Sequence, residues 1–465
     1  MAVSPIGYYK NKMKIKIIDQ TICKTDDPKL LGTFLKVTKA FWTKGEYSKQ
    51  KTEYEAPLVE KDGSFLAGFL PRIIKECDRR GIPLTIEGSF ERKEYKLPLS
   101  YPSITLFDDQ EKLVLRALKE QRGIIQSPMG TGKTIVCYAI VHPCQPCKSL
   151  LVCPSKSILT QTAKKFKEMF GMKVSILSST KIPGIPRDLS GDIVIATINS
   201  LDRMSPEMYC GLFDIVLIDE SHHVCNWEGM YYNFLTHCLA PIRIGVDATP
   251  DKINTPKGMA AEGLLGPVIG KFTFEEAVEA GRIVPPRVVF LPVPINLNAK
   301  QLRNYKEIYD VGIVFNRIRN SIIADYIAAR AKENMTSVVF VKFLNHLDIL
   351  YKLLQERGVD VACVKGAIHD RDRENIRLML NEKKLKSVVA TAQTWSEGVD
   401  VPTLDIVCNA AGYLSEKAVL QMAGRCLRVS EGKTEGIYVD LLDSGRYLSE
   451  HCVRRLLILA ELGWI

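Results

Sequence analysis

The sequence has no uninterrupted apolar run of about 18 residues, the length that a membrane-spanning helix needs. Its beginning, MAVSPIGYYKNKMKIKII, also lacks the apolar core and the small-residue cleavage site of a secretory signal peptide. These absences argue against helical membrane spans and against secretion. We therefore expect a cytoplasmic protein that makes no membrane contact.

A disulfide framework and low-complexity tracts are absent too. The 13 cysteines stand singly among apolar residues, as in TIVCYAI and LLVCPS, which is typical of reduced, buried thiols. HPCQPC, residues 142–147, has ligand-like spacing, but the sequence has no second such pair to complete a tetrahedral zinc site. We predict no metal there.

What the chain does have is length, apolar content and positive charge. Its 465 residues are 46% hydrophobic and 25% charged, enough for more than one core, and its net charge is +10. Residues 1–100 hold 19 Lys and Arg against 13 Asp and Glu. This balance suits a polyanionic partner, although many basic proteins have none.

Short apolar runs alternate with helical patterns from about residue 100, which predicts α/β architecture with parallel sheets. The first set is 122–127, 149–154, 174–179, 192–197, 214–219 and 242–247; the second is 337–342, 360–366, 386–392, 404–410 and 436–442. The segment 281–296 holds four prolines and is predicted to be a linker. We expect an accessory domain at 1–100 and α/β domains at 101–285 and 286–465.

The accessory domain carries no recognisable motif. NKMKIKIID is a predicted strand and LPRIIKECDRRG a predicted helix. Between them, KAFWTKGEYSKQKTEY interleaves basic and aromatic residues. Lys39, Lys44, Lys49, Lys51, Phe41, Trp42, Tyr47 and Tyr54 make up this pattern. It could bind phosphates and stack on exposed bases, or it could be a basic strand pair with its aromatics in a local core.

QSPMGTGKT, residues 126–134, lies between a predicted strand and a predicted helix, the setting of a phosphate-binding loop. Gly130 and Gly132 let the backbone N–H groups face an anion. Lys133 would reach the β- and γ-phosphates, and the Thr134 hydroxyl would hold Mg²⁺. The nucleotide-binding residues predicted here are Ser127, which replaces the usual Gly, with Gly130, Thr131, Gly132, Lys133 and Thr134.

FDIVLIDESHHV supplies the carboxylates that an ATPase needs at the end of an apolar strand. Asp219 is the expected Mg²⁺ ligand, and Glu220 is the expected base that orients the attacking water. Without the phosphate loop, an acidic strand end with no role would be the better interpretation. We expect His222 to be a coupling residue near the γ-phosphate.

Together these motifs resemble those of the superfamily 2 DExH helicases and translocases, over about residues 101–430. The resemblance implies two tandem RecA-like parallel-sheet domains behind a small N-terminal accessory domain, with ATP and Mg²⁺ as cofactors. It implies that Gln110, in LFDDQEKLVLRAL, reads adenine, with Phe107 or Tyr101 as the stacking ring.

Further segments match the family in position and type. LVCPSKSILTQ (Pro154 and Ser155) and IATINSL (Thr197) stand where the first domain contacts nucleic acid. Small hydroxyl residues and helix N-termini can hold a phosphodiester backbone without reading bases. In GVDATP, Asp247 replaces the usual Ser or Thr, so we expect Thr249 rather than Asp247 to couple hydrolysis to domain movement.

The second domain resembles the family in two more segments. In ATAQTWSEGVDVP, the resemblance implies that Thr391 contacts the tracked strand and that Gly398 and Asp400 face the nucleotide. QMAGRCLR provides Gln421, Arg425 and Arg428. On a helix, their spacing of four and three would put them on one face, from which the arginines could neutralise charge on the transferred phosphoryl group.

DESHH and SEGVDVP resemble the DNA-directed members: XPB-like repair translocases, RecG-like fork remodelers and, most closely, the UvsW-type branch-migration helicases of phages. If the chain is phage-encoded, the compartment is the host cytoplasm. The resemblance implies an ATP-dependent DNA helicase that unwinds and branch-migrates forked or four-way DNA, with a monomer favoured. An RNA-directed DExH helicase and a nucleotide-gated DNA clamp that does not translocate remain alternatives.

Overall fold

The computed structural model describes residues 12–44, 49–251, 254–297, 302–366, 370–396 and 401–465. Its contacts divide the chain into two compact units. The first contains residues 1–127 and 132–273, and the second contains residues 128–131 and 274–465. Among the described residues, no helix is both long and apolar enough to cross a membrane.

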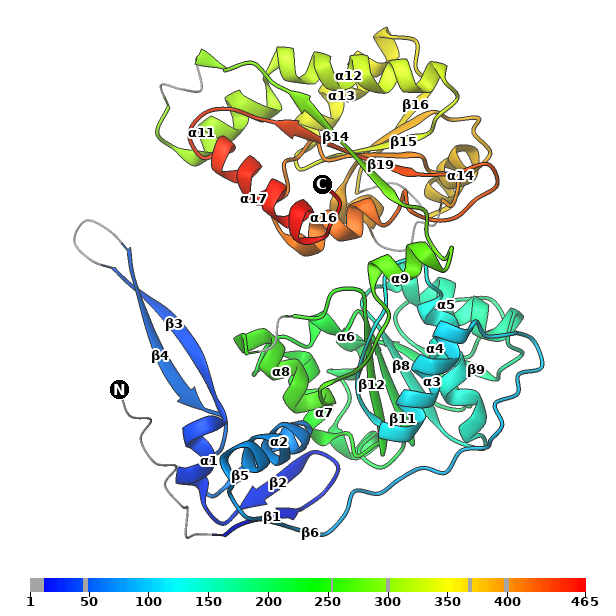
Figure 1. Cartoon of the computed structure of the whole chain (residues 1–465). Helices are drawn as coiled ribbons and strands as arrows, with labels where there is room; N and C mark the ends of the chain where they lie inside the picture. The colour runs from blue at the N-terminus through cyan, green and yellow to red at the C-terminus, as the bar shows by residue number, and fades with distance from the viewer. Residues whose placement is uncertain (1–11, 45–48, 252–253, 298–301, 367–369, 397–400) are drawn as a thin grey trace. The chain divides into compact units, whose positions relative to one another are not determined.

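The first unit is built around a seven-stranded parallel sheet of order β13-β7-β12-β11-β8-β10-β9 (Figure 1). The strands are β7 (Arg122–Gln126), β8 (Ser149–Cys153), β9 (Val174–Leu177), β10 (Ile193–Thr197), β11 (Ile215–Asp219), β12 (Ile242–Asp247) and β13 (Val268–Lys271). All six strands predicted for this domain are confirmed. They are nearly continuous apolar runs because both faces of a parallel sheet are covered by helices.

The helices of this sheet lie mostly in the crossovers between its strands. They are α3 (Asp108–Glu120), α4 (Lys133–Val141), α5 (Lys156–Glu168), α6 (Ile198–Leu201), α7 (Met230–His237) and α8 (Pro256–Leu265). Arg243 of β12 is 1% exposed and donates to the carbonyls of Leu235 and Leu264, near the ends of α7 and α8. This arginine thus satisfies helix carbonyls that would otherwise be buried without partners.

The accessory part has its own small sheet, of order β5-β2-β1-β6. Its elements are β1 (Met13–Ile17), β2 (Ile22–Thr25), α1 (Pro28–Phe34), β5 (Ser64–Leu66), α2 (Leu70–Arg80) and β6 (Leu84–Glu87). The predicted strand and the predicted helix are therefore confirmed as β1 and α2. Gly81 ends α2 with φ of 65°, a left-handed conformation that glycine adopts without strain.

Between α1 and β5 the chain forms an antiparallel hairpin of β3 (Lys36–Lys44) and β4 (Lys49–Pro57), drawn in blue at the left of Figure 1. The strand-pair interpretation of this stretch is thus confirmed for the backbone. Tyr54 is 48% exposed. The side chains of Phe41, Trp42, Lys44, Tyr47, Lys49 and Lys51 lie outside the described part of the chain.

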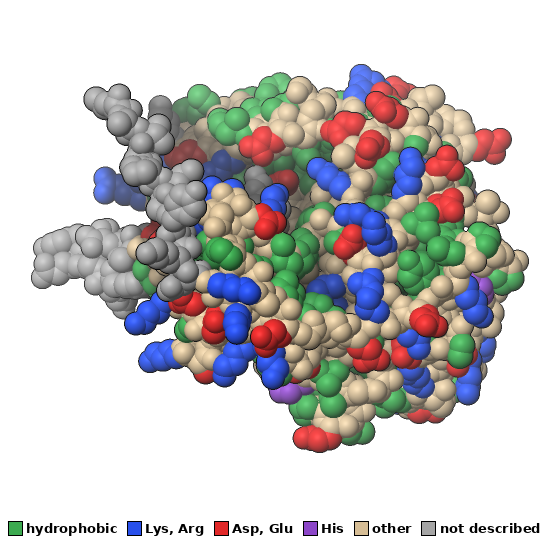
Figure 2. Space-filling view, turned by 60° about the horizontal axis from the view of Figure 1, so that its bottom comes forward, with side chains coloured by type: hydrophobic (Ala, Val, Ile, Leu, Met, Phe, Trp, Pro, Cys, Tyr) green, Lys and Arg blue, Asp and Glu red, His purple; other side chains and the backbone are tan. Residues whose placement is uncertain are grey.

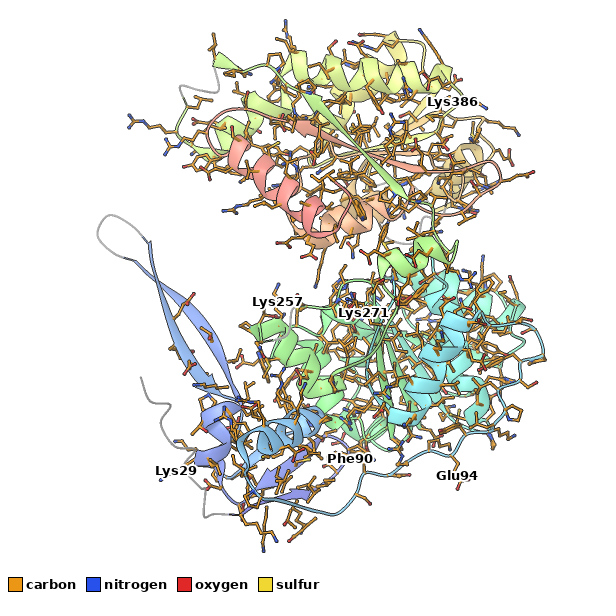
Figure 3. All side chains as sticks on the ribbon, viewed as in Figure 1. Lys29, Phe90, Glu94, Lys257, Lys271 and Lys386 are labelled. Carbon is orange, nitrogen blue, oxygen red and sulfur yellow. The ribbon has the colours of Figure 1, made fainter. Side chains whose placement is uncertain are left out.

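The accessory part and the larger sheet share one hydrophobic core. Residues between Met13 and Ile82 pack in the same buried cluster as Ile124, Leu150 and Leu265. Gly263 lets α8 approach the accessory part closely, since a Cβ there would lie 2.7 Å from a Leu66 methyl carbon. The segment from β6 to α3 continues along the same unit, and the labelled Phe90 and Glu94 mark its course in Figure 3.

The second unit contains a six-stranded parallel sheet of order β14-β19-β18-β15-β17-β16. Its strands are β14 (Pro286–Pro292), β15 (Ser337–Val341), β16 (Val361–Val364), β17 (Ser387–Thr391), β18 (Ile406–Cys408) and β19 (Gly436–Leu442). The helices are α9 (Phe274–Glu279), α11 (Tyr305–Tyr309), α12 (Arg317–Lys332), α13 (Leu344–Glu356), α14 (Asp370–Asn381), α15 (Ala392–Ser396), α16 (Glu416–Ala423) and α17 (Leu448–Glu461). The second predicted set of strands is confirmed.

One prediction fails here, because part of the expected linker is a strand. Residues Pro286–Pro292 form β14, which pairs with β19 along its whole length. Two physical reasons reconcile this strand with its prolines. They stand at its first and last positions on an edge strand, where a missing N–H is tolerated, and the interior RVVFL is rich in β-branched residues.

Candidate active site

The predicted phosphate loop joins β7 to α4. Gly130 and Gly132 have φ of 88° and 87°, a conformation that disfavours side chains, and Lys133 begins α4. The N–H of Ser127 donates to the carbonyl of Asp247 over 2.8 Å, which fixes the loop to the end of β12. The sequence therefore forms the strand, glycine turn and helix start that an anion-binding loop requires.

Three acidic residues and a histidine gather beside Lys133 in the first unit. Asp219 and Asp247 end the neighbouring strands β11 and β12. Nζ of Lys133 lies 3.4 Å from Oε1 of Glu220. Nδ1 of His222 lies 3.4 Å from Oε2 of Glu220 and 3.2 Å from Oδ2 of Asp247. The structure thus brings together the predicted Lys133, Asp219, Glu220 and His222.

The electrostatics of this cluster are unbalanced. Burial and the charge of Glu220 together raise the pKa of Asp219 to about 7, against the opposing charge of Lys133. Burial acts to lower the pKa of Lys133, but the charges of Glu220, Asp219 and Asp247 outweigh it and raise that pKa. One lysine therefore faces more negative charge than it neutralises, which favours a further cation at the cluster.

Asp247 organises the loops around the cluster. Its carboxylate is fully buried, and it accepts hydrogen bonds from the hydroxyl of Ser221, the N–H of His222 and the N–H of Thr249. Burial acts to raise the pKa of Asp247, but the hydrogen bond and charge of His222 outweigh it and lower that pKa. Asp247 thus links the predicted coupling residues His222 and Thr249. The sequence signal for the position of Asp247 was that two predicted parallel strands, 214–219 and 242–247, both end in aspartate.

The residues present fit a nucleotide and a divalent cation. Nζ of Lys133 and Oγ1 of Thr249 are buried and make no hydrogen bond to another described residue. Carboxylate and imidazole atoms of Glu220, His222 and Asp247 lie within 4.8 Å of one another, a separation that a metal ion can bridge. Carboxylate oxygens suit Mg²⁺. The predicted ligands are Asp219, which borders this group, and Thr134, which lies on the first turn of α4.

The predicted adenine-reading residue lies against the phosphate loop. Gln110 is 3% exposed, its Oε1 accepts from the N–H of Phe107, and a Cβ on Gly132 would lie 2.6 Å from its Nε2. Of the two candidate stacking rings, Phe107 is 49% exposed. Tyr101 instead donates to the carbonyl of Ala139 on α4 and packs against Tyr138 and His142. The geometry therefore favours Phe107.

A cavity of about 520 Å³ lies within the first unit, beside the cluster that contains Glu220 and His222. His222 and Ser221 line one part of it, and Arg72, Lys75 and Arg79 of α2 line another. Arg72 also contacts α8, donating to both carboxylate oxygens of Glu262 over 2.7 and 2.6 Å. The accessory part thus reaches the surroundings of the DESHH motif. In Figure 3, Lys257 marks α8 and Lys271 the end of β13.

The predicted nucleic-acid contacts of the first unit lie at the carboxyl-terminal ends of its parallel strands. Pro154 and Ser155 follow β8, and Thr197 ends the neighbouring β10, paired in register with Cys153. Ser155 caps the start of α5, and its Oγ accepts from the N–H of Ile158. Thr197 is 6% exposed, and its hydroxyl contacts that of Ser200. The first turns of α5 and α6 are therefore close together.

Apart from Arg425 and Arg428, the predicted residues of the second unit are Thr391, Gln421, Gly398 and Asp400. Thr391 ends β17, paired in register with Val341 of β15, and its hydroxyl lies 3.0 Å from that of Thr394. Gln421 lies on α16. Gly398 and Asp400 lie outside the described residues.

The predicted helix face of Gln421, Arg425 and Arg428 is wrong. Helix α16 ends at Ala423 with Gly424 as its C-terminal cap, so both arginines lie beyond it. Glycine is a poor helix former, and the chain then turns, with the N–H of Arg425 donating to the carbonyl of Met422. Arg428 forms an isolated antiparallel bridge with Ile283. Arg425 is 7% exposed, and burial lowers the pKa of Arg428 to about 10.

Two family models match this chain. The model described as "Type III restriction enzyme, res subunit" matches residues 103–252, which include the phosphate loop and DESHH. The model described as "Helicase conserved C-terminal domain" matches residues 318–430, which include Thr391 and Arg425. The matches therefore cover strands β7 to β12 of the first sheet and β15 to β18 of the second, and they leave the accessory part unmatched.

Several helicases are similar in sequence. A probable helicase, D10, of Escherichia phage T5 is 26% identical over 73% of this chain and 72% of its own length. The DNA 3'-5' translocase XPB2 of Sulfurisphaera tokodaii is 25% identical over 75% and 84%. The ATP-dependent DNA helicase uvsW of Enterobacteria phage T4 is 23% identical over 81% and 79%.

A solved structure supports the fold. The DNA-bound ATP-dependent Type ISP restriction-modification enzyme LlaBIII aligns with a TM-score of 0.59 at 17% identity. The alignment covers 84% of this chain and 32% of that enzyme. This likeness supports the fold alone.

Proposed function

We propose, from the premise that this chain is a superfamily 2 helicase that uses ATP, that it moves along DNA and branch-migrates forked and four-way junctions. The observation that carries the proposal is the cluster of Lys133, Glu220, His222 and the buried Asp247 beside the phosphate loop. Such a cluster suits nucleotide turnover rather than nucleotide binding alone.

The residues of the first unit divide the chemistry of hydrolysis among them. Lys133 and the loop N–H groups would bind the phosphates, and Thr134 and Asp219 would hold Mg²⁺, which supplies charge neutralisation when bound. Glu220 would orient the attacking water, and its ion pair with Lys133 holds its carboxylate in place. His222 and Thr249, which both contact Asp247, would couple hydrolysis to domain movement.

The second unit would complete the site. Arg425 is buried and Arg428 is half-buried, and we expect both to neutralise charge on the transferred phosphoryl group. Gln421 would contact the nucleotide, as would Gly398 and Asp400. ATP would then favour closure of the two units on one another, and hydrolysis would release it.

DNA would be held by its backbone at the edges of the two sheets. Ser155 and Thr197 offer hydroxyls and nearby helix starts in the first unit, and Thr391 offers a hydroxyl in the second. On the face that Figure 2 presents, basic and acidic side chains are interspersed. The +10 net charge therefore acts there through local contacts rather than through one continuous basic surface.

The hairpin of β3 and β4 is the proposed recognition element for branched DNA. Its strands contain Lys39, Lys44, Lys49 and Lys51, and the register pairs Trp42 with Lys51. A two-stranded ribbon of this length could enter a junction where bases are exposed. A monomer would suffice for such a substrate.

The proposal is tested by ATP-dependent conversion of a synthetic four-way DNA junction into duplex products. The wild type should convert it, whereas Lys133→Ala should neither hydrolyse ATP nor convert the junction. Glu220→Gln should bind ATP and DNA but lose turnover by about 100-fold or more. Comparing the two variants separates nucleotide binding from hydrolysis.

Two outcomes would replace the proposal. If ATP hydrolysis by the wild type is stimulated by RNA but not by duplex DNA, the chain is an RNA-directed helicase. If the wild type hydrolyses ATP but leaves DNA junctions intact, and Glu220→Gln retains full ATP-dependent DNA retention, the chain is a nucleotide-gated clamp.

A further inference from the structure

Aromatic and basic side chains form a surface on the second unit that none of the predicted site residues uses. We name it the tyrosine surface and define it by Tyr305, Tyr447, Phe343, Lys342 and Arg446. Tyr305 begins α11, Phe343 precedes α13, and Tyr447 precedes α17. Three segments far apart in the sequence therefore present aromatic rings together.

Tyr305 and Tyr447 contact each other, and Tyr305 and Phe343 are exposed. The centroids of Tyr305 and Tyr447 lie 6.0 Å apart with the rings edge to face. Tyr305 is 42% exposed and Phe343 40% exposed. An aromatic ring that serves only a core would be covered, so these rings keep faces available to a ligand.

A buried tyrosine supports the exposed rings from below. Tyr309 is 5% exposed, donates its hydroxyl to the carbonyl of Ala411 over 2.7 Å, and meets both Tyr305 and Phe343 edge-on or tilted. Tyr447 has φ of 61°, which is strained for a side-chain-bearing residue. Such strain persists where the surroundings require a side chain to point in one direction.

Positive charge accompanies the rings. Nζ of Lys342 lies 5.3 Å from the centroid of Tyr309 and 5.4 Å from that of Phe343. The guanidinium of Arg446 lies 5.1 Å from the centroid of Tyr447. Both cations belong to exposed residues, so they can bind an anion while they remain on the aromatic faces.

The tyrosine surface adjoins a predicted DNA contact. Lys342 and Phe343 directly follow Val341, the last residue of β15, and Val341 is paired in register with Thr391 of β17. A DNA strand held at Thr391 would therefore run past these aromatic rings at the same edge of the sheet.

We propose that the tyrosine surface stacks an unpaired base of single-stranded DNA, with Lys342 and Arg446 binding its flanking phosphates. This inference rests on the proposed function. It adds that the second unit binds DNA in its single-stranded form. Aromatic stacking with basic neighbours binds single strands of any sequence, because every base has a flat face. A surface of this kind would hold a base separated at a branch point.

The test measures single-strand binding by the full chain carrying Tyr305→Ala or Phe343→Ala. Each should weaken binding of an oligonucleotide without secondary structure by about 5- to 100-fold. A 2-aminopurine placed in the oligonucleotide should be quenched on binding to the wild type and less quenched with the variants. Tyr305→Phe should behave as the wild type, since it keeps the ring.

Leu457→Ala is the matched control, because Leu457 is an exposed apolar residue of α17 without an aromatic ring. It should not change binding or quenching. ATP hydrolysis without DNA should remain at the wild-type rate in all four variants, which also shows that they fold.

The two proposals fail in different ways. If Tyr305→Ala and Phe343→Ala bind single strands as the wild type does while the wild type converts junctions, the tyrosine surface is not a DNA contact and the proposed function stands. If the wild type does not convert junctions, but the alanine variants lose single-strand binding and quenching, the surface binds DNA and branch migration is wrong. Equal losses in Leu457→Ala would also overturn the inference.

Discussion

Asp219 and Asp247 end adjacent parallel strands, yet their pKa values shift in opposite directions. Asp247 accepts three hydrogen bonds and faces His222, so its charged form is favoured despite burial. Asp219 is half-buried beside Glu220, and its pKa rises to about 7. The difference lies in the hydrogen-bond donors that each carboxylate faces rather than in burial.

This difference predicts a pH dependence of stability without nucleotide or metal. The pKa of Asp219 is about 7 in the folded chain, above the value of about 3.9 in an unfolded chain. Its contribution to the free energy of unfolding is therefore fully present below about pH 4 and is lost as the pH rises through 7. Asp219→Asn should become increasingly stable relative to the wild type from pH 5 to pH 8, as measured by thermal unfolding midpoints.

Asp247→Asn is the contrasting variant in the same series. Because the pKa of Asp247 is lowered on folding, its contribution is present above the unfolded pKa and is lost as the pH falls. The variant should therefore be less stable than the wild type at neutral pH. If the midpoint difference for Asp219→Asn stayed constant from pH 5 to pH 8, the raised pKa would be wrong.

Residues in a short sequence motif could be predicted, whereas residues whose role depends on contacts formed on folding could not. Asp219 and Glu220 stand at the end of the apolar strand β11, and Lys133 follows β7 after the glycine loop. The carboxyl ends of neighbouring parallel strands meet at one edge of the sheet, so the grouping of these residues could be predicted from the sequence. The role of Asp247 could not, because it depends on a backbone N–H of His222 and on Thr249, contacts that exist only after folding.

Helix α2 connects the accessory part to α8 through one ion pair. Arg72 donates to both oxygens of Glu262, whose side chain is 8% exposed, and to the side chain of Asn254. Removing the arginine would leave a nearly buried carboxylate without its counter-charge. Arg72→Ala should therefore lower the free energy of unfolding by about 2 kcal/mol, less than for a fully buried pair because Arg72 is partly exposed.

The measurement is the thermal unfolding midpoint of Arg72→Ala and of the double variant Arg72→Met with Glu262→Gln. The double variant should recover part of the loss, since no charge is left unpaired. Arg79→Ala is the control on the same helix, because the Arg79 side chain is 66% exposed and its removal should change little. Equal midpoints for Arg72→Ala and Arg79→Ala would contradict this role of Arg72.

Elements with one dominant signal were predicted, and elements that depend on a distant partner were not. The buried strands of both sheets are apolar runs of the length that parallel strands need. Strand β14 has prolines at both ends, and only its pairing with β19 makes it a strand. Helix α16 stops at Gly424, and beyond it Arg428 bridges to Ile283, a residue distant in the sequence.

The two compact units differ in how their cores are built. In the first unit, the cluster that contains Met13, Phe69 and Ile73 of the accessory part also contains Ile218 and Leu264. In the second unit, two clusters of described residues lie within residues 289–448. The sequence suggested an accessory domain in front of the first sheet but could not reveal this shared core, because the accessory part carries no motif and its apolar residues have no local signature.

This difference predicts how the chain tolerates division. Residues 274–465 expressed alone should fold, because both of their described core clusters are complete within them. Residues 101–273 without the accessory part should not, because Phe69 and Leu66 cover Gly263 and the apolar side of α8, and their removal exposes that surface to water. Cooperative thermal unfolding followed by near-UV circular dichroism measures both fragments, with residues 1–273 as the control that should fold. A cooperative transition for residues 101–273 would mean that the larger sheet is stable without the shared core, and the accessory part would then be a detachable module.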